Sequence, residues 1–210
     1  MKKGMDIFMN QKGLLVIISG PAGSGKGTIV SRLRELAPFD FSVSATTRKP
    51  RPGEQHGVHY YFVDKADFEN KIEQGEMLEY AQYVGNYYGT PKKPVENALA
   101  EGKNIILDIE VKGALQIKEK MPEAIMIYVL PPDYETLLAR IRGRGTETEE
   151  VIQKRMNEAK NDIKVFPRSD YVVINRNNGI DRAAEDVLAI LRAEKMRTLR
   201  NADIPETFFN

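Results

Sequence analysis

Residues 13 to 28 read Gly13-Leu-Leu-Val-Ile-Ile-Ser-Gly-Pro-Ala-Gly-Ser-Gly-Lys-Gly-Thr28. The apolar run from Leu14 to Ile18 has the length and the β-branched content of a strand that is buried on both faces. A glycine-rich turn ends this run, and from Lys26 onward apolar residues such as Ile29 and Leu33 recur at helical spacing. The stretch therefore predicts a strand, a tight loop and a helix in immediate succession.

The residue types in this loop suit a polyphosphate ligand. Gly20, Gly23 and Gly25 allow positive φ angles and a close backbone approach, so successive N–H groups can point into one concavity at the positive end of the helix dipole. Lys26 would add a positive charge for the β- and γ-phosphates. The alternative is a plain glycine-rich turn beside a structural lysine, but the flanking strand and helix favour a phosphate-binding loop.

A hydroxyl that faces Mg²⁺ normally follows the lysine of such a loop, but here Gly27 takes that place and Thr28 comes one residue later. Asp108 is a second candidate for the metal, because it ends the apolar strand that runs from Ile105 to Leu107. In open α/β sheets ligands bind outside the carboxyl ends of the strands, and an acid there can hold Mg²⁺ directly or through water. An acid in this position can also be a simple turn or cap residue, so the assignment depends on the loop at Gly20.

Composition limits the other possibilities. With 210 residues and 41% hydrophobic content, the chain can bury one core and carry inserted lobes. The net charge of +1 gives no global reason to expect a nucleic-acid or membrane partner, and the absence of cysteine excludes disulfides and thiolate metal sites. Since no segment approaches the ~18 apolar residues of a membrane-spanning helix and no signal peptide is visible, we expect a cytoplasmic protein. The sequence does not decide between a monomer and a homo-oligomer.

Strands alternate with helices along most of the chain, which predicts an α/β fold with a parallel sheet and right-handed crossovers. We expect one domain over 13–195, with a three-layer core formed by 13–40, 95–142 and 167–199. An inserted mixed α/β lobe covers 41–94, where proline and glycine separate short strands, and a helical lid covers 143–166. The segments 1–12 and 200–210 are predicted to be flexible tails. Helices are predicted over 64–74, 95–101, 112–120, 133–142, 149–162 and 180–199, and strands over 104–108, 125–130 and 171–174.

Two groups of arginines could bind anions. Arg48 and Arg51 lie on a proline-stiffened loop, where they could converge on one phosphate, although a solvated basic loop is the alternative. A second group surrounds a polar, glycine-containing segment and could neutralise charge on a transferred group. The alternative for that group is an exposed pair of helices balanced by nearby glutamates, and the sequence does not choose between the two. The group consists of Arg140, Arg142, Arg144 and Arg155.

Several stretches together resemble the guanylate kinase family, from about Gly13 to Leu191. The arginine-proline loop and the tyrosine-glycine motif are not shared with phosphate-loop kinases at large. The stretches are Gly20-Pro-Ala-Gly-Ser-Gly-Lys-Gly-Thr28, Ser42-Val-Ser-Ala-Thr-Thr-Arg-Lys-Pro-Arg-Pro-Gly-Glu54, Glu79-Tyr-Ala-Gln, Gly85-Asn-Tyr-Tyr-Gly-Thr-Pro91, Ile106-Leu-Asp-Ile-Glu110 and Arg142-Gly-Arg-Gly-Thr-Glu-Thr148.

The resemblance implies an enzyme that transfers the γ-phosphoryl group of ATP to GMP, with Mg²⁺ as cofactor. It implies that ATP is held by Gly20, Pro21, Ala22, Gly23, Ser24, Gly25, Lys26, Gly27 and Thr28, with Asn175 near the adenine, and that Thr28 and Asp108 face the metal. For GMP it implies base recognition by Ser44, Glu79 and Thr90, phosphate binding by Arg48, Arg51, Tyr60 and Tyr88, and a position near the acceptor for Asp108 and Glu110. The residues implied in catalysis are Lys26, Arg48, Asp108, Arg140, Arg144 and Arg155.

The chain departs from the family pattern at Gly27 and at Glu110, where many members carry aspartate. Two other functions remain as alternatives: another nucleoside monophosphate kinase, notably adenylate kinase, and a guanylate-kinase-like module that binds phosphorylated peptides without catalysis. The acid at Glu79 and the tyrosine-rich lobe argue against adenylate kinase. Lys26 and the intact glycines argue against the binding module, because such modules have a degraded ATP loop.

Overall fold

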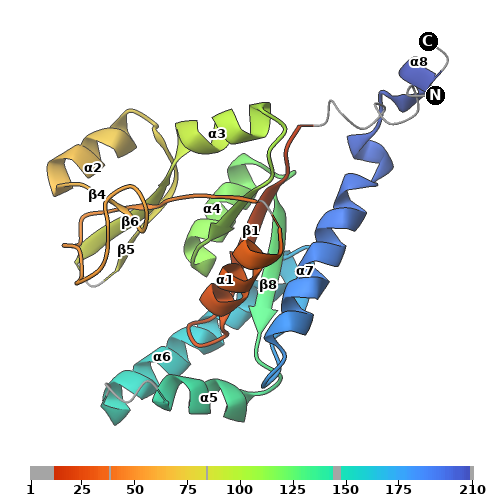
Figure 1. Cartoon of the computed structure of the whole chain (residues 1–210). Helices are drawn as coiled ribbons and strands as arrows, with labels where there is room; N and C mark the ends of the chain where they lie inside the picture. Colours follow the sequence, from red (N-terminus) through yellow and green to blue (C-terminus); the bar gives the residue numbers. More distant parts are fainter. Residues whose placement is uncertain (1–11, 38, 84, 144–147, 209–210) are drawn as a thin grey trace.

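The core of the protein is a five-stranded parallel sheet, seen in a computed structural model that describes residues 12–37, 39–83, 85–143 and 148–208 (Figure 1). The strands follow the order β2-β7-β1-β8-β9 and confirm the predicted α/β class. Their bounds are β1 Leu15–Ser19, β2 Asp40–Phe41, β7 Ile105–Asp108, β8 Ile125–Leu130 and β9 Tyr171–Ile174.

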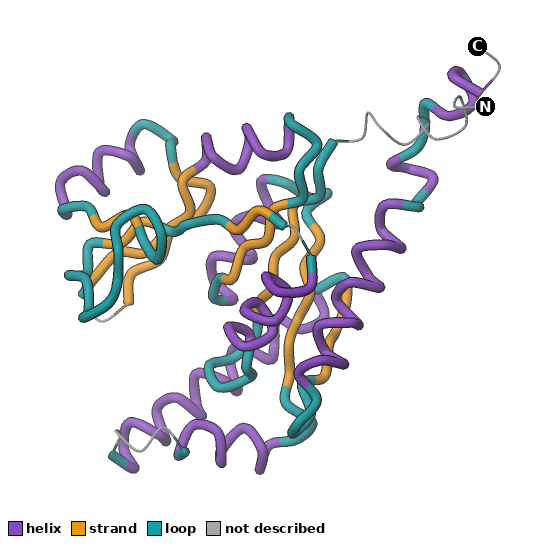
Figure 2. The backbone as a smooth tube through the Cα atoms, viewed as in Figure 1, coloured by secondary structure: helices purple, strands orange, loops and turns teal. Residues whose placement is uncertain are grey.

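Helices cover both faces of this sheet (Figure 2). Because side chains alternate along a strand, Val16 and Ile18 pack against α1 (Lys26–Leu36) and α7 (Ile180–Lys195). Leu15 and Ile17 pack on the opposite face, against α3 (Lys92–Ala100) and α4 (Val111–Lys120). None of the helices within the described residues is long and apolar enough to cross a membrane.

The lobe between β2 and α3 has its own mixed sheet, in the order β4-β3-β6-β5, and projects to the left of the core in Figure 1. Its elements are β3 Ala45–Thr46, β4 Tyr61–Phe62, α2 Lys65–Glu73, β5 Met77–Tyr83 and β6 Asn86–Pro91. The pairing of β5 with β6 shifts register between Met77 and Glu79. Around this irregularity Leu78 joins the hydrophobic cluster of the core, while Met77 joins that of the lobe.

The predicted lid packs on the last helix of the predicted core segment 95–142, at the lower end of Figure 1. Helix α5 (Tyr134–Arg142) and helix α6 (Glu149–Asp162) share a small apolar cluster that includes Leu137, Ile141 and Met156. A 3₁₀ helix, η1 (Ile163–Arg168), then leads the chain back to β9. The start of the predicted lid at 144–147 lies outside the described residues.

Helix α7 ends at Lys195, so the predicted helix to Leu199 was four residues too long. The apolar spacing continues beyond Lys195, but Glu194 near the end of the helix is only 1% exposed, and its carboxylate binds residues outside the helix. Glu194 accepts hydrogen bonds from the Tyr171 hydroxyl at 2.5 Å and from Arg200 Nε at 3.2 Å. The chain therefore turns through η2 (Thr198–Arg200), and a short helix, α8 (Ile204–Phe208), lies within the predicted tail.

We predict that Glu194→Ala lowers the free energy of unfolding by about 2–3 kcal/mol, because it removes the buried acceptor of the Tyr171 hydroxyl and of Arg200 Nε. Burial alone would raise the pKa of Glu194, but the Tyr171 hydrogen bond and the charges of Arg197 and Arg200 outweigh it and lower the pKa. The difference in the free energy of unfolding between wild type and Glu194→Ala should therefore shrink as the pH falls through this lowered pKa.

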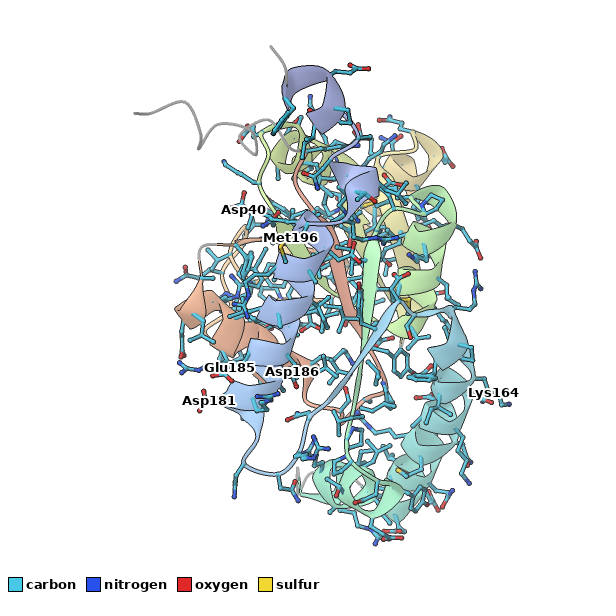
Figure 3. The ribbon with its side chains drawn as sticks, turned by 90° about the vertical axis from the view of Figure 1, so that its right-hand side faces the viewer. Asp40, Lys164, Asp181, Glu185, Asp186 and Met196 are labelled. Carbon is cyan, nitrogen blue, oxygen red and sulfur yellow. The ribbon has the colours of Figure 1, made fainter. Side chains whose placement is uncertain are left out.

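Urea denaturation at several pH values measures the effect. Glu185→Ala is the matched control, since Glu185 lies exposed on the outer side of α7 (Figure 3) and should change stability little. Equal stability of the two variants at neutral pH would contradict the assignment.

Candidate active site

The glycine loop between β1 and α1 has the strained geometry that the sequence predicts. Gly20, Gly23 and Gly25 have φ angles of 145°, 88° and 89°. A Cβ atom added at Gly20 would lie 2.2 Å from the carbonyl oxygen of Val129 on the neighbouring strand β8. The first of these glycines is therefore required by close packing as well as by backbone angle.

The carbonyl oxygen of Ser24 holds the loop to two distant segments. It accepts hydrogen bonds from Asn175 Nδ2 at 2.9 Å and from one Nη atom of Arg140 at 3.3 Å. The other Nη atom of Arg140 donates to the Asn175 carbonyl at 2.9 Å, so the three groups form a closed set. A Cβ atom at Gly25 would lie 2.1 Å from Asn175 Nδ2, which leaves no room for any side chain there.

A cavity of about 310 Å³ lies beside the loop. Asn175 lines it and is only 4% exposed, and its Oδ1 atom has no hydrogen-bond partner among the described residues. The lining residues are Gly25, Thr28, Arg140, Asn175, Arg176, Asn177, Asn178 and Ile180.

Lys26 and Asp108 lie at the carboxyl edge of neighbouring strands. Lys26 Nζ donates to the carbonyl oxygens of Gly20 at 2.6 Å and Pro21 at 3.3 Å, and so folds back over the loop. Asp108 pairs in the sheet with Ile18, two residues before Gly20. Desolvation of the carboxylate by the surrounding protein raises the pKa of Asp108, and the charges of Lys26 and Arg34 oppose this shift without cancelling it.

The donors at this edge fit a Mg²⁺ ion that arrives with nucleotide. Thr28 and Asp108 are exposed and supply oxygen atoms of the type that Mg²⁺ prefers. Within the described residues there is no group of three or more acids or histidines that could hold a metal alone. At nucleotide sites, water and phosphate oxygens commonly complete the coordination shell of Mg²⁺.

On the lobe, Glu54 organises the predicted phosphate-binding arginines. The Nη atoms of Arg48 donate to the two carboxylate oxygens of Glu54 at 3.0 and 2.9 Å, and the backbone N–H of Arg51 donates to Glu54 at 2.7 Å. The hydrogen bond from Arg48, followed by that from Arg51, lowers the pKa of Glu54 to about 2. Glu54 is not among the site residues predicted from the sequence, although a single acid that closes a basic loop is a usable signal.

Two tyrosines predicted at the phosphate site lie next to Arg48. The Arg48 guanidinium carbon is 5.5 Å from the centre of the Tyr60 ring, and the Tyr60 and Tyr88 rings meet edge to face at 6.2 Å. Burial raises the pKa of Tyr60, and the negative charge of Asp108 contributes to the shift. The side chain of Arg51 is exposed.

Glu79 lies buried at the base of the lobe and is only 5% exposed. It pairs with Thr90 across the sheet, and the Thr90 hydroxyl donates to Glu79 Oε1 at 2.7 Å. Burial raises the pKa of Glu79, and the Thr90 hydrogen bond and the charge of Lys120 only partly oppose it. Ser44 is half-buried directly before β3, and Glu110 is exposed at the N-cap of α4.

The predicted site residues therefore form two groups. The first group meets at the edge of the core sheet and consists of the glycine loop, Asp108, Arg140 and Asn175. The second group lies on the lobe and includes Arg48, Tyr60, Tyr88 and Glu79. Arg155 is half-buried on α6, and Arg144 lies outside the described residues. A phosphate-binding loop at the carboxyl edge of a parallel sheet, next to a lobe with a basic and aromatic cluster, defines a phosphotransferase of the phosphate-loop class.

Comparison with known proteins identifies the family. Residues 12–194 match the family profile described as guanylate kinase, and the chain belongs to this family. It is 51% identical to the guanylate kinase of Halalkalibacterium halodurans over 90% of this chain and 93% of that protein, and 49% identical to that of Desulfitobacterium hafniense over 90% and 94%. The crystal structure of guanylate kinase from Anaplasma phagocytophilum matches with a TM-score of 0.73 and 32% identity, covering 90% of each chain.

We predict that Gly27→Ser keeps turnover within about threefold of wild type and raises the free energy of unfolding by roughly 0.5 kcal/mol, because serine forms helices better than glycine. Gly27 lies in the first turn of α1, and an added Cβ atom would meet only Asp108 Oδ2, at 3.8 Å. Steady-state kinetics and urea denaturation test this. Gly25→Ser is the contrasting variant and should lose activity, since its side chain would collide with Asn175. A large loss in Gly27→Ser would show that the glycine itself is needed.

We also predict that Glu79→Gln raises the melting temperature at pH 7–8. A carboxyl group whose pKa is raised by folding destabilises the folded state when ionised, and this penalty disappears below its ordinary pKa of 4.5. The gain should therefore shrink as the pH falls toward that value. Thermal unfolding from pH 4 to pH 8 measures it, with the exposed Glu73→Gln as control. A gain that grows in acid would contradict the sign of the shift.

Proposed function

We propose that the protein is a cytoplasmic enzyme that transfers the γ-phosphoryl group of ATP to GMP or dGMP and releases ADP and the nucleoside diphosphate. Family membership supports the reaction class. The observation that carries the choice of acceptor is the buried Glu79, whose carboxylate accepts a hydrogen bond from the Thr90 hydroxyl.

ATP binding is assigned to the loop and the cavity beside it. The loop N–H groups and Lys26 would hold the phosphates, and the cavity lined by Asn175 would receive the nucleoside. Mg²⁺ held by Thr28, Asp108 and the phosphates would neutralise negative charge on the transferred group. Of the residues implied by the family resemblance, Arg140 has the firmest support, because it is already bonded to the loop.

GMP recognition is assigned to the lobe. Guanine presents an N1–H and an N2–H₂ donor side by side, and the two oxygens of Glu79 would accept hydrogen bonds from them. The hydroxyl-bearing residues Thr90 and Ser44 lie on β6 and directly before its neighbour β3. Arg48, Tyr60 and Tyr88 would bind the phosphate together with Arg51. Glu54 and the Lys49 carbonyl occupy one Nη atom of Arg48, and the second Nη atom, which donates one N–H to Glu54, would give its other N–H to the ligand.

The reaction needs positioning and charge neutralisation rather than a nucleophilic side chain. Lys26, Arg140, Arg144 and Arg155 would stabilise charge on the phosphoryl group, and Asp108 would lie near the accepting oxygen. Closure of the lobe (41–94) and the lid (143–166) over the core would exclude water, which otherwise would hydrolyse ATP.

A coupled assay of ATP with GMP, dGMP, AMP, UMP and CMP tests the proposal. We expect GMP and dGMP as substrates and a kcat/KM for AMP that is lower by about 10⁴, because the bare N1 of adenine would face the Glu79 carboxylate. Glu79→Ala should lose much of this preference. Lys26→Met is the control and should slow turnover with every acceptor by several orders of magnitude.

Two outcomes would refute the proposal. Phosphorylation of AMP within tenfold of GMP would favour a different nucleoside monophosphate kinase. An unchanged GMP preference in Glu79→Ala would show that the base is recognised elsewhere.

A further inference from the structure

One face of helix α4 contacts the segment of β5 that carries Glu79. Gly113, Gln116 and Lys120 follow each other at helical spacing and meet three consecutive residues of β5. Gln116 bonds both backbone groups of Tyr80, at 2.8 Å to its oxygen and 3.2 Å to its nitrogen. Lys120 Nζ donates to the Leu78 carbonyl at 2.5 Å. The helix thus fixes the backbone on both sides of Glu79.

Gly113 lies where the Glu79 side chain meets this helix. A Cβ atom added at Gly113 would lie 2.3 Å from Glu79 Oε2, 2.8 Å from its carboxyl carbon and 3.3 Å from its Cγ. The three nearest heavy atoms therefore all belong to Glu79. Gly113 is buried and helical, and it is not among the glycines with positive φ, so backbone angle does not require glycine here.

Glycine inside a helix is unfavourable by roughly 1 kcal/mol relative to alanine, so a packing reason is expected. The reason visible here is the space that the carboxylate fills. The register shift at Met77/Glu79 directs Glu79 toward Thr90 and α4, and Thr90 fixes one carboxylate oxygen while the other lies over Gly113. The carboxylate cannot keep this position beside a methyl group.

We propose that Gly113 is a specificity-determining residue for guanine, because its missing side chain lets the Glu79 carboxylate lie against helix α4 with both oxygens in place for the base. The inference rests on the proposed function and extends it to a residue that itself bears no functional group. Alanine at 113 would push Glu79 off its Thr90 partner and remove the two-oxygen contact with N1–H and N2–H₂.

The experiment is a double-mutant cycle of Gly113→Ala and Glu79→Ala, read as kcat/KM for GMP, KM for ATP and melting temperature. Gly113→Ala alone should lower kcat/KM for GMP by about tenfold to hundredfold, with KM for ATP within twofold of wild type. In the Glu79→Ala background the same change should have almost no effect, because no carboxylate remains to be displaced. Glu79→Asp, whose side chain is shorter, should restore part of the activity of Gly113→Ala.

Glu119→Ala is the matched control on the same helix, since Glu119 is exposed and forms a surface ion pair with Arg168. Equal GMP kinetics of Gly113→Ala and wild type would overturn the inference. Losses that add in the double variant would also overturn it, because they would assign Gly113 to the folding of α4 rather than to Glu79. Wild-type enzyme without GMP turnover would instead refute the proposed function, so the two failures are distinguishable.

Discussion

The carbonyl oxygen of Ser24 is the point on which the arrangement of the nucleotide loop depends. A loop that turns its N–H groups outward to a ligand must direct some carbonyl groups into the protein, where each needs a donor. Asn175, directly after β9, and Arg140, on α5, supply these donors. Residues more than a hundred positions apart in sequence thus fix one peptide group, and the loop conformation follows from the whole sheet rather than from its glycines alone.

The same contact joins the loop to α5, the helix that precedes the predicted lid. Arg140 lies on α5, which packs through Leu137 and Ile141 against α6. These two side chains also lie within 3.1 Å of the position that a Cβ atom would take at Gly23. A change in the angle of α5 would therefore act on the loop through two routes, a polar one at Ser24 and an apolar one at Gly23. The position of the loop and the position of α5 are therefore coupled.

The parts of the fold that could be predicted from sequence are those fixed by local pattern. The strands at 125–130 and 171–174 and the helix at 149–162 appear with the predicted bounds, because each is a periodic run with clear ends. The predicted end of α7 was wrong because the buried position of Glu194 depends on hydrogen bonds from Tyr171 and Arg200, which lie outside the helix. The roles of Glu54 and Gly113 were missed for a similar reason. Each depends on which side chain tertiary structure brings near, and local spacing does not contain that information.

Leu78 and Glu79 are neighbours in sequence but belong to different environments: Leu78 packs in the hydrophobic core, and Glu79 accepts a hydrogen bond from Thr90 in the lobe. Side chains in a strand alternate with a period of two, so the loss or gain of one residue in β5 would exchange them and place a carboxylate in the core. A point substitution near Glu79 changes single contacts of the carboxylate, whereas an insertion or deletion changes its whole environment. The lobe therefore tolerates changes in the composition of β5 better than changes in its length.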